Sequence, residues 1–274
     1  MMEQIKDKLK SMGLMESTIK TYTHIISSFI KKTALPITNE SVNSYLDYLM
    51  LHKNYSARSR NLVGKVLKFY CREFHGFEPT IKKAKENKPI PKICEDNEFS
   101  QILSVTPNIK HRLCLLLMRY SGLRRWEVIR VMKHHIQPDG RLLVKSGKGD
   151  KDRYTIIPPQ VLEQLNNFIS LLPADNPYIF KGQNSKYYNP RTPEQILVNA
   201  FKKLHWDKNK WFGCHALRHA FTIHCLDVLK LDVDLVAKML GHSSIRTTQI
   251  YTQLRKLNLI DVISRYNTIT IPIQ

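Results

Sequence analysis

The first part of the chain carries the apolar spacing of helices. Between Ile19 and Ile30 the apolar residues recur three and four positions apart, so that they gather on one helical face. Similar runs start after Thr38 and after Ser56, two residue types that cap helix N-termini. No stretch here alternates between apolar and polar residues as a strand does. Residues 1–80 are therefore predicted to form a small helical domain.

A change in composition marks a domain boundary. Residues 81–92 are rich in lysine, contain two prolines and hold few apolar side chains. A segment of this kind lacks the apolar area to build a core of its own. It is predicted to be an interdomain linker, with the boundary near residue 90.

Beyond the linker, residues 93–274 are predicted to form a mostly helical domain with one small sheet. Two short apolar runs, 141–144 and 154–157, predict antiparallel strands joined by a basic loop that contains glycine. Helical spacing is expected at 98–105, 110–121, 159–172, 192–204, 215–229, 233–240 and 244–253, with a short helix after Arg124. The fold class is thus mainly α, with a helical N-terminal domain and an α+β second domain.

The charge of the chain narrows the class of partner. Lys and Arg number 43 against 23 Asp and Glu, a net charge of +20. Residues 1–90 hold 16 basic and 8 acidic residues and residues 91–274 hold 27 and 15, so both parts are basic. This excess favours a polyanion, either nucleic acid or an acidic membrane, over a basic surface that serves only solubility.

The predicted helix after Ser56 offers the first candidates for DNA contacts. Four cations lie on it, mostly away from its apolar face: Arg58, Arg60, Lys65 and Lys68. A helix beside DNA would place them in this way, although an exposed basic face is also common without any ligand.

Several other classes of protein are disfavoured. No apolar run approaches the roughly 18 residues of a membrane span, and the N-terminus has no apolar signal segment. The protein is therefore predicted to be cytoplasmic and, with nucleic acid as its favoured partner, associated with the nucleoid. The five cysteines are widely spaced without a Cys-x-x-Cys pair, which predicts free buried thiols. No nucleotide-binding glycine loop and no compelling carboxylate cluster is present, so no cofactor and no metal is expected.

Four short motifs follow one another along the second domain. Each residue in them is ordinary alone, but their order and spacing are specific: Gly122-Leu-Arg124-Arg-Trp-Glu127, then Lys148 in a basic turn, then His215-Ala-Leu-Arg218, then Leu240-Gly-His242 with Tyr251 nine residues later. This series resembles the tyrosine recombinase, or phage-integrase, family, which includes the Xer-type resolvases. One departure is that Arg125 and Trp126 stand where the family usually has small or aliphatic residues.

The resemblance implies a site-specific DNA recombinase. Its catalytic residues would be Arg124, Lys148, His215, Arg218, His242 and Tyr251. It implies a helical domain that clamps DNA together with the catalytic domain, and a C-terminal tail that docks on a neighbouring subunit. It also implies a homotetramer that exchanges strands of two duplexes through a Holliday junction. The length of the chain favours a compact Xer-like enzyme or the integrase of a simple mobile element.

The chemistry of these residues suits phosphoryl transfer from DNA. Two guanidiniums, Arg124 and Arg218, can grip the oxygens of a phosphodiester through forked hydrogen bonds. Nearby cations would stabilise the phenolate of Tyr251, and His215 would relay its proton. Lys148 would protonate the leaving 5′-oxygen. Because the 3′-phosphotyrosyl bond conserves the energy of the broken diester, neither ATP nor metal is needed.

The remaining residues have supporting roles in this hypothesis. Glu127 is expected to orient a member of the basic cluster, and Lys151 and Arg153 in the loop after Lys148 are expected to contact DNA. Three alternatives stay open: a catalytically silent DNA-binding or architectural protein on the same fold, a type IB topoisomerase-like enzyme, and a metal-dependent nuclease or transposase. The DNA target, the regulatory partners and the cis or trans delivery of Tyr251 are not encoded in recognisable motifs.

Overall fold

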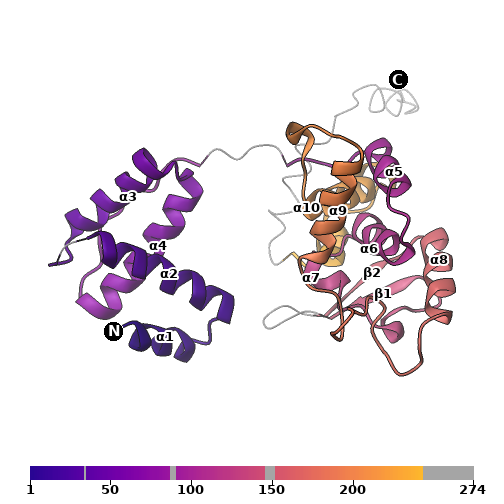
Figure 1. The fold of residues 1–274 in the computed structure, drawn as a ribbon, viewed down its shortest axis with the longest axis horizontal. Coiled ribbons are helices and arrows are strands. Elements are labelled where there is room, and N and C mark those ends of the chain that lie inside the picture. Colours follow the sequence, from indigo (N-terminus) through magenta and orange to yellow (C-terminus); the bar gives the residue numbers. More distant parts are fainter. Residues whose placement is uncertain (34, 87–90, 146–151, 243–274) are drawn as a thin grey trace, which may run out of the picture. The chain divides into compact units, whose positions relative to one another are not determined.

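The chain divides into two compact units, Met1–Pro89 and Ile90–Gln274, each with its own core (Figure 1). The computed structural model describes residues 1–33, 35–86, 91–145 and 152–242. Within these ranges no helix is both long enough and apolar enough to cross a membrane.

The first unit is a bundle of four helices. They are α1 (Met2–Ser11), α2 (Glu16–Lys32), α3 (Asn39–Lys53) and α4 (Ala57–His75). The side chains of Thr38 and Ser56 each accept a backbone N–H of the first turn, as the sequence predicts for helix caps. The core is built from the apolar faces of all four helices, and it contains Ile26, Leu46 and Leu67 with no exposed surface.

The segment that follows α4 is attached to the first unit. Residues 79–86, here called the strap, run extended along α3 and α4 (Figure 1). The Asn61 side chain of α4 donates to the Ala84 carbonyl and accepts from its N–H, both at 2.9 Å. The Ile81 side chain packs against the core. The first half of the predicted linker therefore lies against the helical unit, because side-chain amides satisfy its backbone where apolar residues are few.

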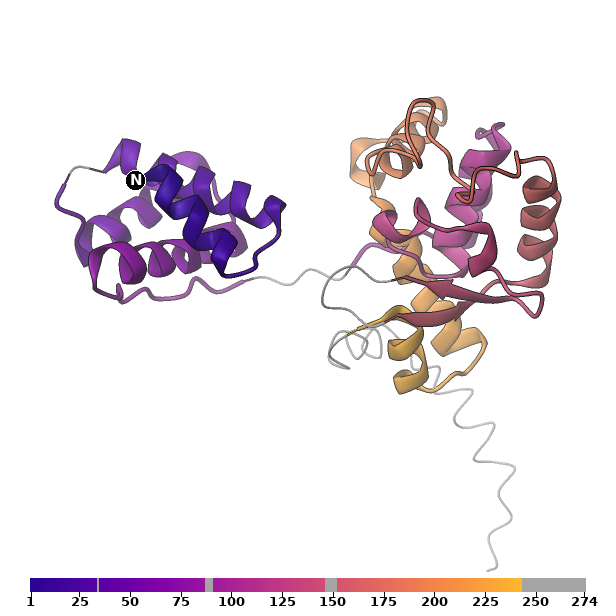
Figure 2. The same cartoon turned by 90° about the horizontal axis from the view of Figure 1, so that it is seen from below.

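The second unit is mostly helical around one β-hairpin. Its helices are α5 (Asp96–Ser104), α6 (Ile109–Tyr120), α7 (Arg125–Val128), α8 (Pro159–Ser170), α9 (Thr192–Lys203), α10 (Cys214–Ile223) and α11 (Val233–Leu240), with short 3-10 turns η1 (Lys133–His135) and η2 (Lys208–Lys210). Strands β1 (Arg141–Val144) and β2 (Arg153–Ile156) pair antiparallel, with Leu142 opposite Thr155. This confirms the predicted fold class. Figure 2 shows α11 on one side of the strands and α6 on the other.

One local prediction is revised by the structure, and a second is not tested by it. The helix expected over 215–229 is not uniform, because α10 gives way to a π-helical turn, η3 (His224–Val228). A π-turn widens the backbone spiral, a change that apolar spacing does not reveal. The helix expected over 244–253 lies outside the described residues. Trp206 and Trp211 both pack on Phe201 at the edge of the core.

Replacing Leu67 by Ala should destabilise the first unit by about 2–5 kcal/mol, because the side chain is fully buried and its removal leaves a cavity. Leu62→Ala on the same helix is the control, since Leu62 is 45% exposed and should cost less than about 0.5 kcal/mol. Urea unfolding followed by circular dichroism measures both. Equal shifts for the two variants would contradict the proposed core.

Candidate active site

The carboxylate of Glu127 is the centre of a cluster of arginines. It lies in the first turn of α7, the short helix that begins directly after Arg124. One carboxylate oxygen accepts the backbone N–H of Arg124 at 2.7 Å, and the other accepts its guanidinium Nη1 at 2.9 Å. Glu127, the residue predicted to orient the basic cluster, therefore also completes the capping box at the N-terminus of α7.

Arg153 of β2 makes a forked pair with the same carboxylate. Its Nη1 and Nη2 each donate to one oxygen of Glu127 at 2.8 Å, and its Nε donates to the Met239 carbonyl at 2.8 Å. The residue is only 9% exposed. The prediction that Arg153 contacts DNA is therefore corrected: all three nitrogens of its guanidinium are bound inside the unit.

Arg218 of α10 is held by backbone carbonyls. Its Nη1 donates to Gly122 at 2.6 Å and its Nη2 to Leu240 at 2.5 Å, while Nη1 lies 3.8 Å from the Glu127 carboxylate. Gly122 has a φ of +66°, and a Cβ there would lie 2.4 Å from the Phe221 ring. Glycine at 122 thus lets the chain turn close to α10 and present its carbonyl to Arg218.

Arg124 completes the cluster and is its most accessible member. Its Nη2 donates to the Gly241 carbonyl at 3.1 Å, and its side chain keeps 32% of its surface exposed. Three guanidiniums, from Arg124, Arg153 and Arg218, thus surround one carboxylate. The cluster carries an excess of two positive charges, which is the electrostatic setting that an anion such as a phosphodiester requires.

The electrostatics of Glu127 follow from these contacts. Burial alone would raise its pKa, but the hydrogen bonds and charge of Arg153, the Arg124 N–H and the charge of Arg218 outweigh it and lower the pKa to about 2. Glu127 is therefore ionised at any physiological pH, and it keeps the three arginines from repelling one another.

Three histidines lie beside the arginines. Burial, followed by the positive charges of Arg218, Arg124 and Arg153, lowers the pKa of His242 to about 4. Burial and the nearby His215 lower the pKa of His219 to about 4 as well. The pKa of His215, at the start of α10, is lowered by burial and then by Arg218. Neutral imidazoles are thus favoured at neutral pH, able to donate one hydrogen bond and accept another.

The structure brings together four of the six predicted catalytic residues. Arg124, Arg218 and His242 lie around the Glu127 cluster, and His215 is one turn before Arg218 on α10. Lys148, Lys151 and Tyr251 lie outside the described residues. Among the described residues no three His, Cys, Asp or Glu side chains converge as metal ligands.

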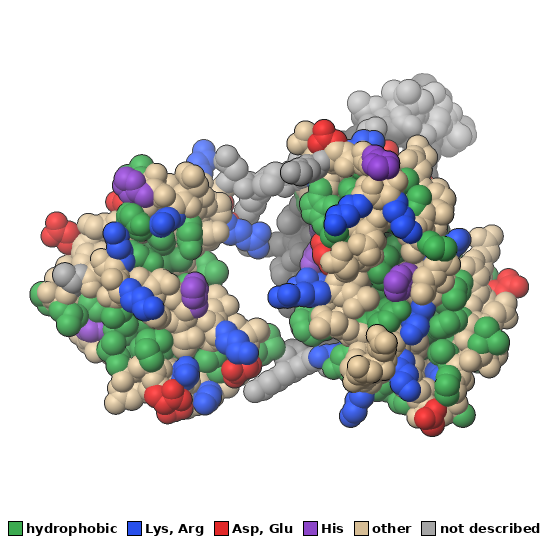
Figure 3. All heavy atoms as spheres, viewed as in Figure 1, with side chains coloured by type: hydrophobic (Ala, Val, Ile, Leu, Met, Phe, Trp, Pro, Cys, Tyr) green, Lys and Arg blue, Asp and Glu red, His purple; other side chains and the backbone are tan. Residues whose placement is uncertain are grey.

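The predicted DNA contacts on α4 divide into two groups. Arg58 and Lys65 are exposed, and Lys68 is partly exposed and pairs with Glu78 at 3.1 Å. The prediction for Arg60 is corrected, because this residue is 8% exposed and its guanidinium donates to the Lys82 carbonyl at 2.8 Å and to Asp47 at 3.5 Å. Lys and Arg side chains nevertheless spread over both units (Figure 3).

Sequence reasoning missed the inward position of Arg153. Strand β2 alternates buried and exposed residues, with Arg153 in phase with the buried Thr155. This period of two was the available signal, and it places the guanidinium toward the core.

The sequence matches the phage integrase family over residues 92–257 and the phage integrase N-terminal SAM-like domain over residues 1–78. Tyrosine recombinase XerA of Pyrococcus furiosus is 31% identical, over 97% of this chain and 93% of its own. The XerH site-specific recombinase in a post-cleavage complex with palindromic difH substrate has a TM-score of 0.71 at 19% identity, covering 97% of this chain and 85% of that one. A lambda integrase tetramer bound to a Holliday junction has a TM-score of 0.69 at 19% identity, covering 89% and 76%.

Replacing Glu127 by Gln should lower the free energy of unfolding in a pH-dependent way. The carboxylate has a pKa of about 2 when folded against an ordinary 4.5, so it stabilises the fold above pH 4.5, and this contribution is lost as the pH falls toward 2. The difference between wild type and variant should be about 3 kcal/mol at pH 7 and less than half of that at pH 3.

Urea unfolding at the two pH values measures this difference. Glu163→Gln on α8 is the matched control, since that carboxylate is exposed and should change stability by less than about 0.5 kcal/mol at either pH. A difference for Glu127→Gln that does not depend on pH would contradict the role of its charge.

Proposed function

The chain belongs to the phage integrase family and is a site-specific tyrosine recombinase, and we propose that it exchanges DNA strands through a 3′-phosphotyrosyl bond formed by Tyr251. The observation that supports this most directly is the cluster of guanidiniums around Glu127, two of which come from the motif positions Arg124 and Arg218. An anion-binding site assembled from motif residues favours an active enzyme over a silent DNA-binding protein on the same fold.

The arginine cluster would bind the scissile phosphate. Arg124 is its exposed member. Arg218 is buried beside it, and both of its terminal nitrogens donate to backbone carbonyls that fix the position of the guanidinium. Negative charge grows on the non-bridging oxygens as Tyr251 attacks, and fixed guanidiniums stabilise it without reorganising. Glu127 would be a positioning residue, because it holds Arg124 and Arg153 but does not itself face the phosphate as a donor.

Two side chains would transfer protons, and a third would donate a hydrogen bond. The phenol oxygen of Tyr251 forms a bond to phosphorus while the bond from phosphorus to the 5′-oxygen breaks. His215, with its lowered pKa, would accept the phenol proton, and Lys148 would protonate the departing 5′-oxygen. His242, neutral at pH 7, would donate its N–H to a non-bridging oxygen. The reverse attack by a 5′-hydroxyl releases Tyr251, so no metal ion and no ATP enters the cycle.

The biological unit would be a homotetramer on two duplexes with a specific recombination site. The lambda integrase structure is a tetramer on a Holliday junction, and the relative with 31% identity is named XerA. We propose the same assembly for this chain, on DNA in the cytoplasm and associated with the nucleoid. Resolution of replicated DNA and integration of a simple mobile element use the same chemistry and remain equally compatible with the site.

The C-terminal tail would join the subunits of this tetramer. A pocket of about 550 Å³ between the start of α5 and η3 is a suitable acceptor. Three carboxylates line it, from Glu95, Asp96 and Asp227, and so does the 65% exposed Val228. Arg119 lies at the same pocket but is buried, and its Nη2 donates to the Asp96 carboxylate. The tail after Tyr251 combines leucines with Arg255 and Lys256, which complement such a surface.

Tyr251→Phe should abolish the covalent protein–DNA complex while leaving folding and DNA binding intact, because it removes only the nucleophilic oxygen. Wild-type protein on a nicked suicide substrate should accumulate a 3′-linked adduct in chelator and without ATP. Arg124→Ala and Arg218→Ala should lose at least about a hundredfold in cleavage rate, as the loss of a transition-state donor does. Gel analysis of denatured adducts measures all of these.

The polarity of the adduct tests the assignment. Attachment at a 5′-phosphate, or through a residue other than Tyr251, would overturn it. Loss of cleavage in chelator would favour a metal-dependent nuclease. Relaxation of a plasmid that lacks a recombination site would favour a type IB topoisomerase-like enzyme.

Truncation after Thr252 should spare binding to a single site but prevent tetramer formation and recombination. Val228→Glu should have the same effect from the acceptor side, because it places a charge in the proposed pocket. Leu171→Glu at the end of α8 is the control, since it is 82% exposed and lies outside that pocket. Analytical ultracentrifugation on DNA measures assembly. Tetramers formed by the truncated chain would show that the tail packs only on its own subunit.

A further inference from the structure

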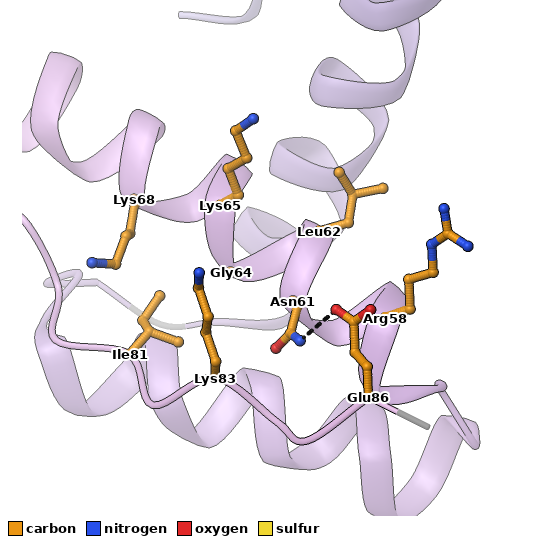
Figure 4. Close-up of a pocket in the computed structure, with 9 residues that line it drawn as sticks. All are labelled: Arg58, Asn61, Leu62, Gly64, Lys65, Lys68, Ile81, Lys83 and Glu86. Carbon is orange, nitrogen blue, oxygen red and sulfur yellow. Dashed lines mark hydrogen bonds between the residues drawn. The ribbon is translucent and has the colours of Figure 1, made fainter. Parts of the chain in front are cut away.

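The first unit contains a cavity that combines α4 with the strap. It has a volume of about 430 Å³, and its walls come from Arg58 to Lys68 on one side and from Ile81 to Glu86 on the other (Figure 4). Four cations line it, from Arg58, Lys65, Lys68 and Lys83, against the single carboxylate of Glu86. In Figure 4 the Lys83 side chain extends from the strap toward Gly64 of α4.

Most of these cations are available to a ligand. Within the described residues Arg58, Lys65 and Lys83 have no ion pair, and only Lys68 is paired, with Glu78 at 3.1 Å. The Glu86 carboxylate accepts the Asn61 amide at 2.9 Å and keeps its negative charge. Because four cations line the cavity against this one carboxylate, its lining carries an excess of positive charge, which an anion would stabilise on entering.

The strap is fastened so that Lys83 faces this cavity. Arg60 binds the Lys82 carbonyl on one side of Lys83, and Asn61 binds both backbone groups of Ala84 on the other. At the start of the strap, the Thr80 N–H donates to Asn39 at 2.8 Å and its carbonyl accepts from Asn43 at 3.1 Å. The backbone on either side of Lys83 is thus fixed by side chains of α3 and α4.

We propose that this cavity holds a phosphate of the DNA backbone, with Lys83 of the strap and Lys65 and Arg58 of α4 as its ligands, and that Asn61 is the residue that positions Lys83. The inference rests on the proposed function only for the identity of the anion. It makes the strap half of a DNA-contact site, and it couples DNA binding to the segment through which the two units are connected.

The salt dependence of DNA binding tests the site in the full-length protein. Each phosphate contact contributes about 0.9 to the slope of log affinity against log salt. With a mixed-sequence duplex as the probe, Lys83→Gln should reduce the slope by about 0.9. Lys82→Gln is the matched control, with the same charge change on the neighbouring strap residue, which does not line this cavity. Equal slope changes for the two variants would overturn the proposal.

A double-mutant cycle tests the positioning role of Asn61. In an Asn61→Ala background, Lys83→Gln should change the slope by much less than 0.9, because the strap no longer holds Lys83 at the cavity. Trypsin should cleave the strap of free Asn61→Ala faster than that of the wild type, while an unchanged urea transition would show that the helices remain folded. Additive effects of the two substitutions would refute the coupling.

The covalent adduct separates this proposal from the proposed function. At saturating duplex carrying the recombination site, the wild type and the Lys82→Gln control should both form the Tyr251 adduct, since Lys82 lies outside the cavity and outside the reacting cluster. No adduct in the wild type would count against the recombinase chemistry and leave the slope result standing. A normal adduct with unchanged slopes would count against the cavity alone.

Discussion

The site of the second unit depends on the contacts that the Glu127 carboxylate makes with three arginines. It draws Arg124 from the start of α7, Arg153 from β2 and Arg218 from α10 toward one point, and these elements are far apart in the sequence. Without a central negative charge, three guanidiniums this close would repel one another and leave costly unpaired charges in a buried place. With it, they form a fixed positive surface whose surplus charge is available to a substrate.

The sequence predicted the participants of this cluster better than its internal order. The motif spacing brought Arg124, Arg218 and His242 together and suggested that Glu127 orients a basic partner. Arg153 was expected at the DNA because it follows a lysine-rich loop, whereas its phase on β2 turns it inward. The same reasoning applies to Arg60, which is in helical phase with the buried Val63 and Leu67. Charge suggests exposure, but the periodicity of the backbone decides the direction of a side chain.

The helices and the hairpin followed from apolar periodicity, since burial of one face is a local property of the sequence. The strap did not, because its attachment depends on amide side chains of α3 and α4 that bind its backbone. Hydrogen bonds of this kind leave no pattern in the segment that receives them. They also change how the two basic halves of the chain are connected, because part of the predicted linker belongs to the first unit.

Arg218 is held by the carbonyls of Gly122 and Leu240, which belong to the backbone and persist whatever side chain is present. Substitutions of the side chains around the site therefore leave these acceptors in place, whereas changes in the path of the backbone remove them. That path depends on Gly122 and Gly241, where φ is +66° and +64° and a Cβ would lie 2.4 Å from the Phe221 ring and 2.9 Å from the Arg153 side chain. The anchoring of Arg218 thus depends on two residues that carry no functional group at all.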